Sequence, residues 1–228
     1  MKPAREFTAE FLGTFALTFF GGAAIMQTRN VDAGAGLLEV ALAHGLVLGL
    51  MISALIRISG NFNPAVSLGL LATGRITPTQ AGTFIAGQFT GAIVAALSLK
   101  ALFPAALWES ARGTRQMVSL DVTTAQAFAL EGLATAILML AVMGTTADGK
   151  GRRVGGVAVG MAYVVGMLAI GPLTGGSMNP ARTIGPMIAT GGYEGLALYL
   201  AAPIVGAVVA ALLYRHLLQD DGDASPTA

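Results

Sequence analysis

The tripeptide Asn-Pro-Ala occurs twice in this chain, beginning at Asn63 and again at Asn179. Asparagine caps a helix with its side-chain oxygen, and proline at the first helical position needs no backbone N–H, so each copy predicts a helix start. The apolar stretches that follow, about 64–74 and 180–190, would each reach roughly 16 Å as helix, about half of a bilayer. The amide N–H groups of both asparagines are then left to donate hydrogen bonds to a solute oxygen. An ordinary loop turn could explain one copy, but not two copies inside apolar repeats.

A fixed positive charge follows the second tripeptide only. Arg182 stands where the first copy has Val66. Because an arginine at membrane depth is costly, such a residue is by default functional and faces a wet cavity. The alternative is an arginine that only ties loop carbonyls together, and the two roles can coexist.

The elements that position these residues are expected to be membrane helices. Of the 228 residues, 54% are hydrophobic and 11% are charged, and the mean hydropathy is +0.72. Soluble domains carry about 25% charged residues. A helix of about 20 residues crosses the hydrocarbon layer of a bilayer. Segments of sufficient length and apolarity run over about 7–27, 36–58, 79–103, 123–145, 154–172 and 194–218.

An internal repeat relates the two halves of the chain. The sequence GAIVAAL from Gly91 recurs as GAVVAAL from Gly206, 115 positions later (206 minus 91), close to the spacing of 116 (179 minus 63) between the tripeptides. Each half carries three spans, an odd number, so the second copy must be inverted relative to the first. We therefore predict an all-α membrane protein with six transmembrane helices and two re-entrant half-helices. The expected boundaries within a single domain, 1–228, are about 1–115 for repeat one, 116–219 for repeat two and 220–228 for a disordered tail.

Composition argues against several classes of protein. The net charge of +1 provides no basic field for nucleic acid. Cysteine is absent, and the only histidines are His44 and His216, too few for a His-based metal centre. No paired acids or Ser-His arrangement is evident for hydrolysis inside the membrane. The sequence therefore predicts a non-enzyme with no cofactor, no metal and no nucleic-acid partner.

Basic residues indicate the orientation of the helices. Lysine and arginine are more frequent on the side of the six-span arrangement that holds both termini, and the positive side of a membrane protein is cytoplasmic. We therefore expect both termini in the cytoplasm and a multi-pass protein of the inner (plasma) membrane. Trp108 and Tyr199 are expected in the headgroup layer, where amphipathic rings are favoured.

Two longer motifs around the tripeptides resemble those of the major intrinsic protein family, the aquaporins and glycerol facilitators. They run from Ile58 to Val66 (ISGNFNPAV) and from Gly171 to Arg182 (GPLTGGSMNPAR). The resemblance extends over essentially the whole chain and implies an aquaporin-like homotetramer in a lipid bilayer, with one pore per subunit. It also implies that Arg182 lies at the external constriction, where it donates hydrogen bonds to solute and repels cations. The first motif is one residue shorter than the family's usual pattern and lacks a histidine before the asparagine.

The family's spacing implies a role for further residues. The implied pore midplane is formed by Asn63 and Asn179, and the implied selectivity constriction by His44, Met167, Gly176 and Arg182. The implied pore-lining carbonyls belong to Gly60, Asn61, Phe62, Gly175 and Ser177. The buried carboxylates of Glu10 and Glu131 are implied to hold one loop each, because buried carboxylates need partners. Proton-carrying carboxylates are the competing interpretation.

The implied constriction resembles that of plant tonoplast intrinsic proteins. Gly176 removes a side chain and widens the ring, Met167 is flexible and apolar, and a neutral His44 offers a donor or an acceptor. We expect a passive channel for water and small neutral solutes such as ammonia or urea. A metalloid- or glycerol-permeable facilitator is the alternative, although Thr183 replaces the aspartate that follows the arginine in glycerol facilitators. An ion-coupled secondary transporter is a further alternative, and His44 could instead be a helix-contact residue.

Overall fold

The computed structural model describes residues 3–30, 33–147 and 155–219, so the predicted tail at 220–228 lies outside the described residues. In this part of the chain helices are joined by loops, and no strand occurs. The long helices are α1 (Pro3–Gln27), α2 (Leu37–Leu55), α4 (Pro78–Leu102), α6 (Thr124–Val142), α7 (Gly155–Thr174) and α9 (Leu196–Leu213). All six are long and apolar enough to cross a membrane. The predicted all-α membrane fold with six spans is confirmed.

Local sequence explains where the long helices begin. Thr77 caps α4 by accepting a hydrogen bond from the N–H of Gln80, whose side chain bonds back to the Thr77 N–H. Thr123 and Gln126 form the same reciprocal cap before α6. This pairing satisfies donors that the first turn of a helix leaves without partners.

Two half-length helices follow the Asn-Pro pairs. Helix α3 (Pro64–Ala72) is two residues shorter than expected, and α8 (Pro180–Thr190) has the expected length. Gly191 ends α8 in the left-handed conformation, with φ of 75°, which suits a residue without a Cβ. The short helix α5 (Ala105–Ser110) and a 3-10 turn (Arg112–Thr114) lie in the connection between α4 and α6. The predicted pair of half-helices is confirmed.

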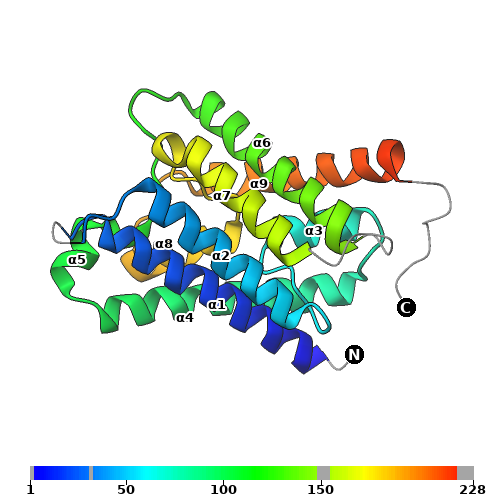
Figure 1. The fold of residues 1–228 in the computed structure, drawn as a ribbon, viewed down its shortest axis with the longest axis horizontal. Coiled ribbons are helices and arrows are strands. Elements are labelled where there is room, and N and C mark those ends of the chain that lie inside the picture. Colours follow the sequence, from blue (N-terminus) through cyan, green and yellow to red (C-terminus); the bar gives the residue numbers. More distant parts are fainter. Residues whose placement is uncertain (1–2, 31–32, 148–154, 220–228) are drawn as a thin grey trace.

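Helix pairing follows the repeat. In the first half α1 packs along α4, in the second half α6 packs along α9, and α2 packs along α7 to join the halves. Each half-helix contacts the opposite half: α3 packs on α9, and α8 packs on α4. In Figure 1 the start of α1 and the end of α9 lie at the right, whereas α5 lies at the left. Both ends of the six-helix arrangement therefore share one face of the molecule.

Glycines at the repeated GAxVAAL sequence permit the two equivalent helix pairs to approach closely. A Cβ at Gly91 would overlap the carbonyl oxygen of Phe11 on α1, and a Cβ at Gly206 would overlap the carbonyl oxygen of Gly132 on α6. Small residues allow such backbone approach between membrane helices. The sequence repeat is therefore also a repeat of packing.

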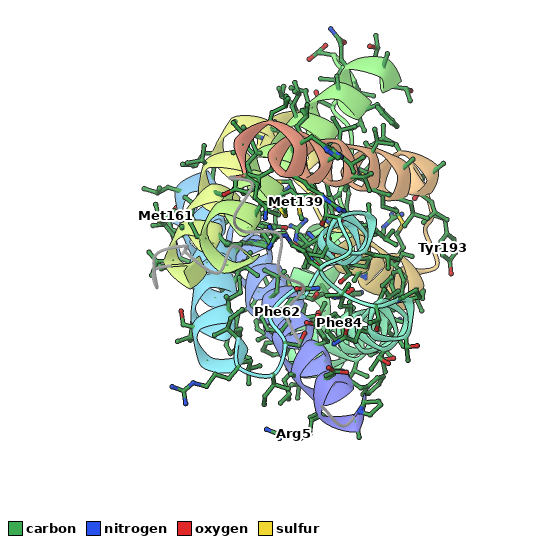
Figure 2. The ribbon with its side chains drawn as sticks, turned by 90° about the vertical axis from the view of Figure 1, so that its right-hand side faces the viewer. Arg5, Phe62, Phe84, Met139, Met161 and Tyr193 are labelled. Carbon is green, nitrogen blue, oxygen red and sulfur yellow. The ribbon has the colours of Figure 1, made fainter. Side chains whose placement is uncertain are left out.

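The outer surface of the bundle is apolar, and its interior holds the polar groups. Figure 2 views the molecule along its longest axis, with Phe62 and Met139 inside the bundle and Met161 and Tyr193 at its edge. Phe62 and Met139 are fully buried, whereas Met161 is 46% exposed. An apolar surface that faces lipid, with the buried polar groups paired inside the protein, is the arrangement that a bilayer requires.

The two aromatic residues expected in the headgroup layer are buried within the protein. Tyr199 is fully buried, and its hydroxyl donates to the Thr174 carbonyl at 2.6 Å. Trp108 packs in a cluster with Met26 and Leu99. Both rings are therefore enclosed by protein partners instead of being open to lipid headgroups.

Candidate functional site

Each half-helix begins at an asparagine that caps it. The Asn63 Oδ1 accepts from the N–H of Ala65 at 2.9 Å. The Asn179 Oδ1 accepts from the N–H of Ala181 at 3.0 Å and from the N–H of Arg182 at 3.3 Å. Because the oxygen of each side chain is used for capping, the NH₂ group of each side chain points away from its own helix.

The two asparagine NH₂ groups cross-link the two loops. Asn63 Nδ2 donates to the Met178 carbonyl at 2.7 Å, and Asn179 Nδ2 donates to the Phe62 carbonyl at 2.8 Å. Phe62 and Met178 both adopt positive φ, 50° and 51°, although neither is glycine. The half-helix starts therefore meet, as the inverted repeat predicts. An amide nitrogen carries two N–H groups, so this cross-link uses one N–H group of each side chain.

A buried carboxylate holds the first loop. Glu10 Oε1 accepts from the N–H of Asn61 at 2.9 Å, and its Oε2 accepts from the N–H of Phe62 at 2.7 Å. The hydroxyl of Ser59 also donates to Oε1, and Gln88 Nε2 donates to Oε2 at 2.6 Å. Glu10 is fully buried, so these four donors replace the water that a carboxylate would otherwise need.

The second loop is held in the same way. Glu131 Oε1 accepts from the N–H of Ser177 at 2.8 Å and from the Thr174 hydroxyl at 2.7 Å. Its Oε2 accepts from the N–H of Met178 at 2.7 Å. In both halves a glutamate of the first span binds consecutive N–H groups directly before the asparagine.

Three of the four residues assigned to the constriction are in contact. Arg182 is buried, and its Nη1 donates to the Gly176 carbonyl at 3.2 Å. Gly176 has φ of 56°, and a Cβ there would lie 2.9 Å from the Met167 sulfur. The absence of a side chain at Gly176 therefore allows Met167 to pack closely against the loop that Arg182 binds.

His44 joins this group through a tyrosine that the sequence did not single out. The His44 ring stacks on Tyr163 with ring centroids 5.9 Å apart, and the Tyr163 hydroxyl donates to the Ser177 carbonyl at 2.6 Å. His44 Nδ1 lies 2.8 Å from the Val40 carbonyl, so it carries the proton that it donates there. Nε2 is then an acceptor, and it has no partner among the described residues.

The carbonyls assigned to the pore lining have different surroundings. The Phe62 carbonyl accepts a hydrogen bond from Asn179, and the Ser177 carbonyl accepts one from Tyr163. Each of these two carbonyl oxygens therefore keeps one lone pair without a bond. Gly60 and Asn61 are half-buried in the first loop, and Gly175 packs against the backbone of Gln116.

A cavity of about 400 Å³ is bordered by Met167, which was assigned to the constriction, and by Gly175. It is also lined by Thr114, Arg115 and Gln116, which belong to the connection after α5. Sequence reasoning missed these residues, because this connection carries no motif. Among the described residues no group of three or more His, Cys, Asp or Glu side chains could hold a metal ion.

Comparisons with known proteins identify the family. Residues 1–214 match the family described as major intrinsic protein. The chain is 34% identical to Nodulin-26 of Glycine max, over 98% of this chain and 81% of that protein. It is 36% identical to Aquaporin TIP4-4 of Zea mays, over 97% of this chain and 90% of that protein. It is also 37% identical to Glycerol uptake facilitator protein-like 6 of Lactiplantibacillus plantarum, over 95% of this chain and 100% of that protein.

A solved structure has the same fold. The X-ray structure of the aquaglyceroporin from Plasmodium falciparum matches with a TM-score of 0.84 and 26% sequence identity. The match covers 95% of this chain and 97% of that chain. With its cross-linked half-helices inside six membrane spans, this chain belongs to the major intrinsic protein family.

Proposed function

We propose that this protein is a passive transmembrane channel that conducts water and small neutral solutes and excludes ions and protons. The observation that carries the proposal is the reciprocal pair of hydrogen bonds from Asn63 to Met178 and from Asn179 to Phe62. This pair fixes two helix starts against each other at the centre of a six-helix bundle. Family membership supports the same function.

The exclusion of cations follows from charge. Each helix start carries roughly half a positive charge, and two of them face the same point. Arg182 adds a full positive charge close by, on the first turn of α8. A water molecule that accepts hydrogen bonds from both asparagines presents its lone pairs to them, so a chain of water molecules cannot pass a proton at that point.

The solute range includes water and, in addition, ammonia or urea. Gly176 and Met167 leave the constriction wider than bulky side chains would, and His44 Nε2 and Arg182 provide one acceptor and donors. Glycerol is the second candidate, since one relative is named a glycerol uptake facilitator-like protein and the solved relative is an aquaglyceroporin. Thr183 stands where glycerol facilitators have an aspartate after the arginine, and this difference favours water, ammonia and urea over glycerol.

We further propose a homotetramer in the inner (plasma) membrane, with both termini in the cytoplasm. The apolar outer face, on which Leu46 and Leu133 are more than 60% exposed, supports burial against lipid and neighbouring subunits. Arg75 and Arg215 lie close together at the face that holds the start of α1, in keeping with an excess of basic residues on the cytoplasmic side.

The test is solute flux into proteoliposomes followed by stopped-flow light scattering. Wild-type protein should raise water permeability above that of empty liposomes without a proton or sodium gradient. Met167→Trp should fill the constriction and abolish the increase, whereas Val165→Trp, two residues away on α7 but 57% exposed, should not. Flux that saturates and requires an ion gradient would instead identify a coupled transporter.

A further inference from the structure

A groove of about 320 Å³ opens at the surface of the bundle, between the start of α1 and the end of α2. Apart from Arg5 and Thr8, its walls consist of alanine, leucine and isoleucine side chains. The Thr8 hydroxyl donates to the Ala4 carbonyl at 2.8 Å, so its proton is already used. Within this apolar groove Arg5 is therefore the lining residue whose donors remain for a ligand.

The groove extends from the end of the first membrane span into it. Arg5 lies in the first turn of α1, and Leu12 lies seven residues further along the same helix, about 10 Å deeper at a rise of about 1.5 Å per residue. Leu12 is 45% exposed, and in Figure 2 Arg5 projects from the edge of the bundle. A ligand that fits this groove must therefore carry a polar group at the membrane surface and an apolar part beneath it.

Two positive charges at the polar end of the groove have no carboxylate partner. Arg5 forms no ion pair among the described residues, and Glu6 beside it is buried and accepts from Gln80 Nε2 at 3.2 Å. Arg57 directly precedes Ile58 of the groove wall, and it is exposed and also without an ion pair in the described part of the chain. The cytoplasmic leaflet of a membrane is rich in anionic lipids, which attract basic residues at its surface. The charge and the shape of the groove therefore complement an anionic phospholipid.

We propose that this groove binds one anionic phospholipid of the leaflet at the face that holds the start of α1. The phosphate of the lipid binds Arg5 and Arg57, and one of its acyl chains lies along Leu12. Burial of the chain against the aliphatic wall and the attraction of the two arginines for the phosphate both favour this lipid. The inference does not depend on which solute the channel conducts.

The groove lies next to the support of the first loop. Ala9 and Ile58 line it, and the residues that directly follow them, Glu10 and Ser59, are hydrogen-bonded to each other. An acyl chain in the groove therefore packs against both of the segments that this hydrogen bond joins. A bound lipid should stabilise the folded protein, and thermal unfolding can detect it.

The test is the midpoint of thermal unfolding of the protein in detergent, measured while phosphatidylglycerol is added. This anionic lipid should raise the wild-type midpoint by about 3 °C or more, and phosphatidylcholine with the same acyl chains should raise it much less. Arg5→Gln and Arg57→Gln should each increase the half-saturating concentration of phosphatidylglycerol about fivefold, because each removes one charge that attracts the lipid. Arg112→Gln makes the same change at an exposed arginine near α5, at the opposite end of the molecule in Figure 1, and should leave that concentration unchanged.

A fourth variant tests the apolar part of the groove. Thr8 is exposed on the groove wall, so Thr8→Trp should fill the groove and weaken the response to phosphatidylglycerol although both arginines remain. If Thr8→Trp instead dissociated the oligomer on size-exclusion chromatography and left the lipid response unchanged, a second copy of this chain would cover the groove, and the inference would be wrong.

Three other results would also overturn the inference. The first is a wild-type midpoint that rises equally with phosphatidylglycerol and phosphatidylcholine. The second is a pair of variants, Arg5→Gln and Arg57→Gln, that respond to lipid as Arg112→Gln does. The third is an equal rise with inorganic phosphate at the same concentration, because a free anion would then bind without any need for the apolar groove.

Discussion

The loops before α3 and α8 are built alike but end differently. In each, a glutamate carboxylate binds two consecutive backbone N–H groups, and the bond to the residue before the asparagine is 2.7 Å in both. After the asparagine, however, the first loop continues to Val66 and the second to Arg182. The difference teaches that the repeat specifies the scaffold of the pore, whereas its selectivity depends on the side chains in which the two copies differ.

The largest expected effect comes from the carboxylate of the second loop. In the wild type the two oxygens of Glu131 accept from the backbone N–H groups of Ser177 and Met178. Glu131→Gln replaces one of these oxygens by an NH₂ group, so one of the two backbone N–H groups loses its acceptor. Leaving a buried donor without a partner costs about 1–3 kcal/mol, so we expect a marked fall in thermal stability and loss of water flux. The midpoint of thermal unfolding in detergent and stopped-flow permeability measure the two effects.

The matched change in the first loop should be milder. Glu10 is bound by Gln88 Nε2, and the Oε1 of Gln88 has no partner among the described residues. After Glu10→Gln, the Gln88 amide can rotate by half a turn and accept from the new NH₂ group. The second loop has Thr174 at this place, and its hydroxyl oxygen already accepts from the N–H of Gly176 at 3.2 Å while the hydroxyl donates to Glu131, so it has less capacity to accept from a new NH₂ group. A larger loss of stability for Glu10→Gln than for Glu131→Gln would contradict this account of the two loops.

Replacing the charge should make the second loop resemble the first. Arg182→Val inserts the residue found at position 66 and removes a guanidinium group from beside Gly176. We expect urea and glycerol permeability to rise relative to water by roughly tenfold, because the ring becomes wider and loses its strongest donors. Cation flux should rise far less, since both helix starts remain. A variant with unchanged solute ratios would mean that Arg182 only ties the loop together.

Much of this scaffold could be predicted from the sequence, because it depends on local rules. Asn-Pro predicts where a helix starts, and the short apolar stretch that follows predicts that the helix crosses only half of the membrane. The predicted ends of α3 and α8 agree with the structure to within two residues. The asparagine cross-link was harder to foresee. It depends on left-handed backbone at Phe62 and Met178, which neither residue type favours.

The surroundings of Arg182 lie beyond what a motif can predict. Gln116 and Thr114 line the same small cavity as Arg182, and they come from a connection without regular spacing that packs against Gly175. The same limit applies to Tyr163 and Tyr199. Their hydroxyls bind the Ser177 and Thr174 carbonyls, and only tertiary structure brings these helices to the second loop.

A smaller effect is expected at His44, and it distinguishes a solute-facing side chain from a helix contact. His44→Phe keeps a ring that can stack on Tyr163 but removes the Nε2 acceptor. If Nε2 faces the solute, ammonia permeability should fall a few-fold relative to water with little change in thermal stability. If His44 is only a helix contact, the unfolding midpoint should change while the ratio does not. Measurement of both quantities on one preparation distinguishes the two.

The smallest effect concerns a tether that the second loop has in addition to its glutamate. Tyr163→Phe removes the hydroxyl that donates to the Ser177 carbonyl at 2.6 Å but keeps the ring beside His44. Loss of one buried hydrogen bond costs about 1 kcal/mol, so the unfolding midpoint should fall slightly. The Ser177 carbonyl then gains a lone pair for water, and Glu131 still holds the loop, so water flux should persist. If Tyr163→Phe instead abolished water flux, as Glu131→Gln is expected to do, the Glu131 carboxylate would not be the main support of the second loop. The two halves would then be alike in sequence, but their loops would not be held in place in the same way.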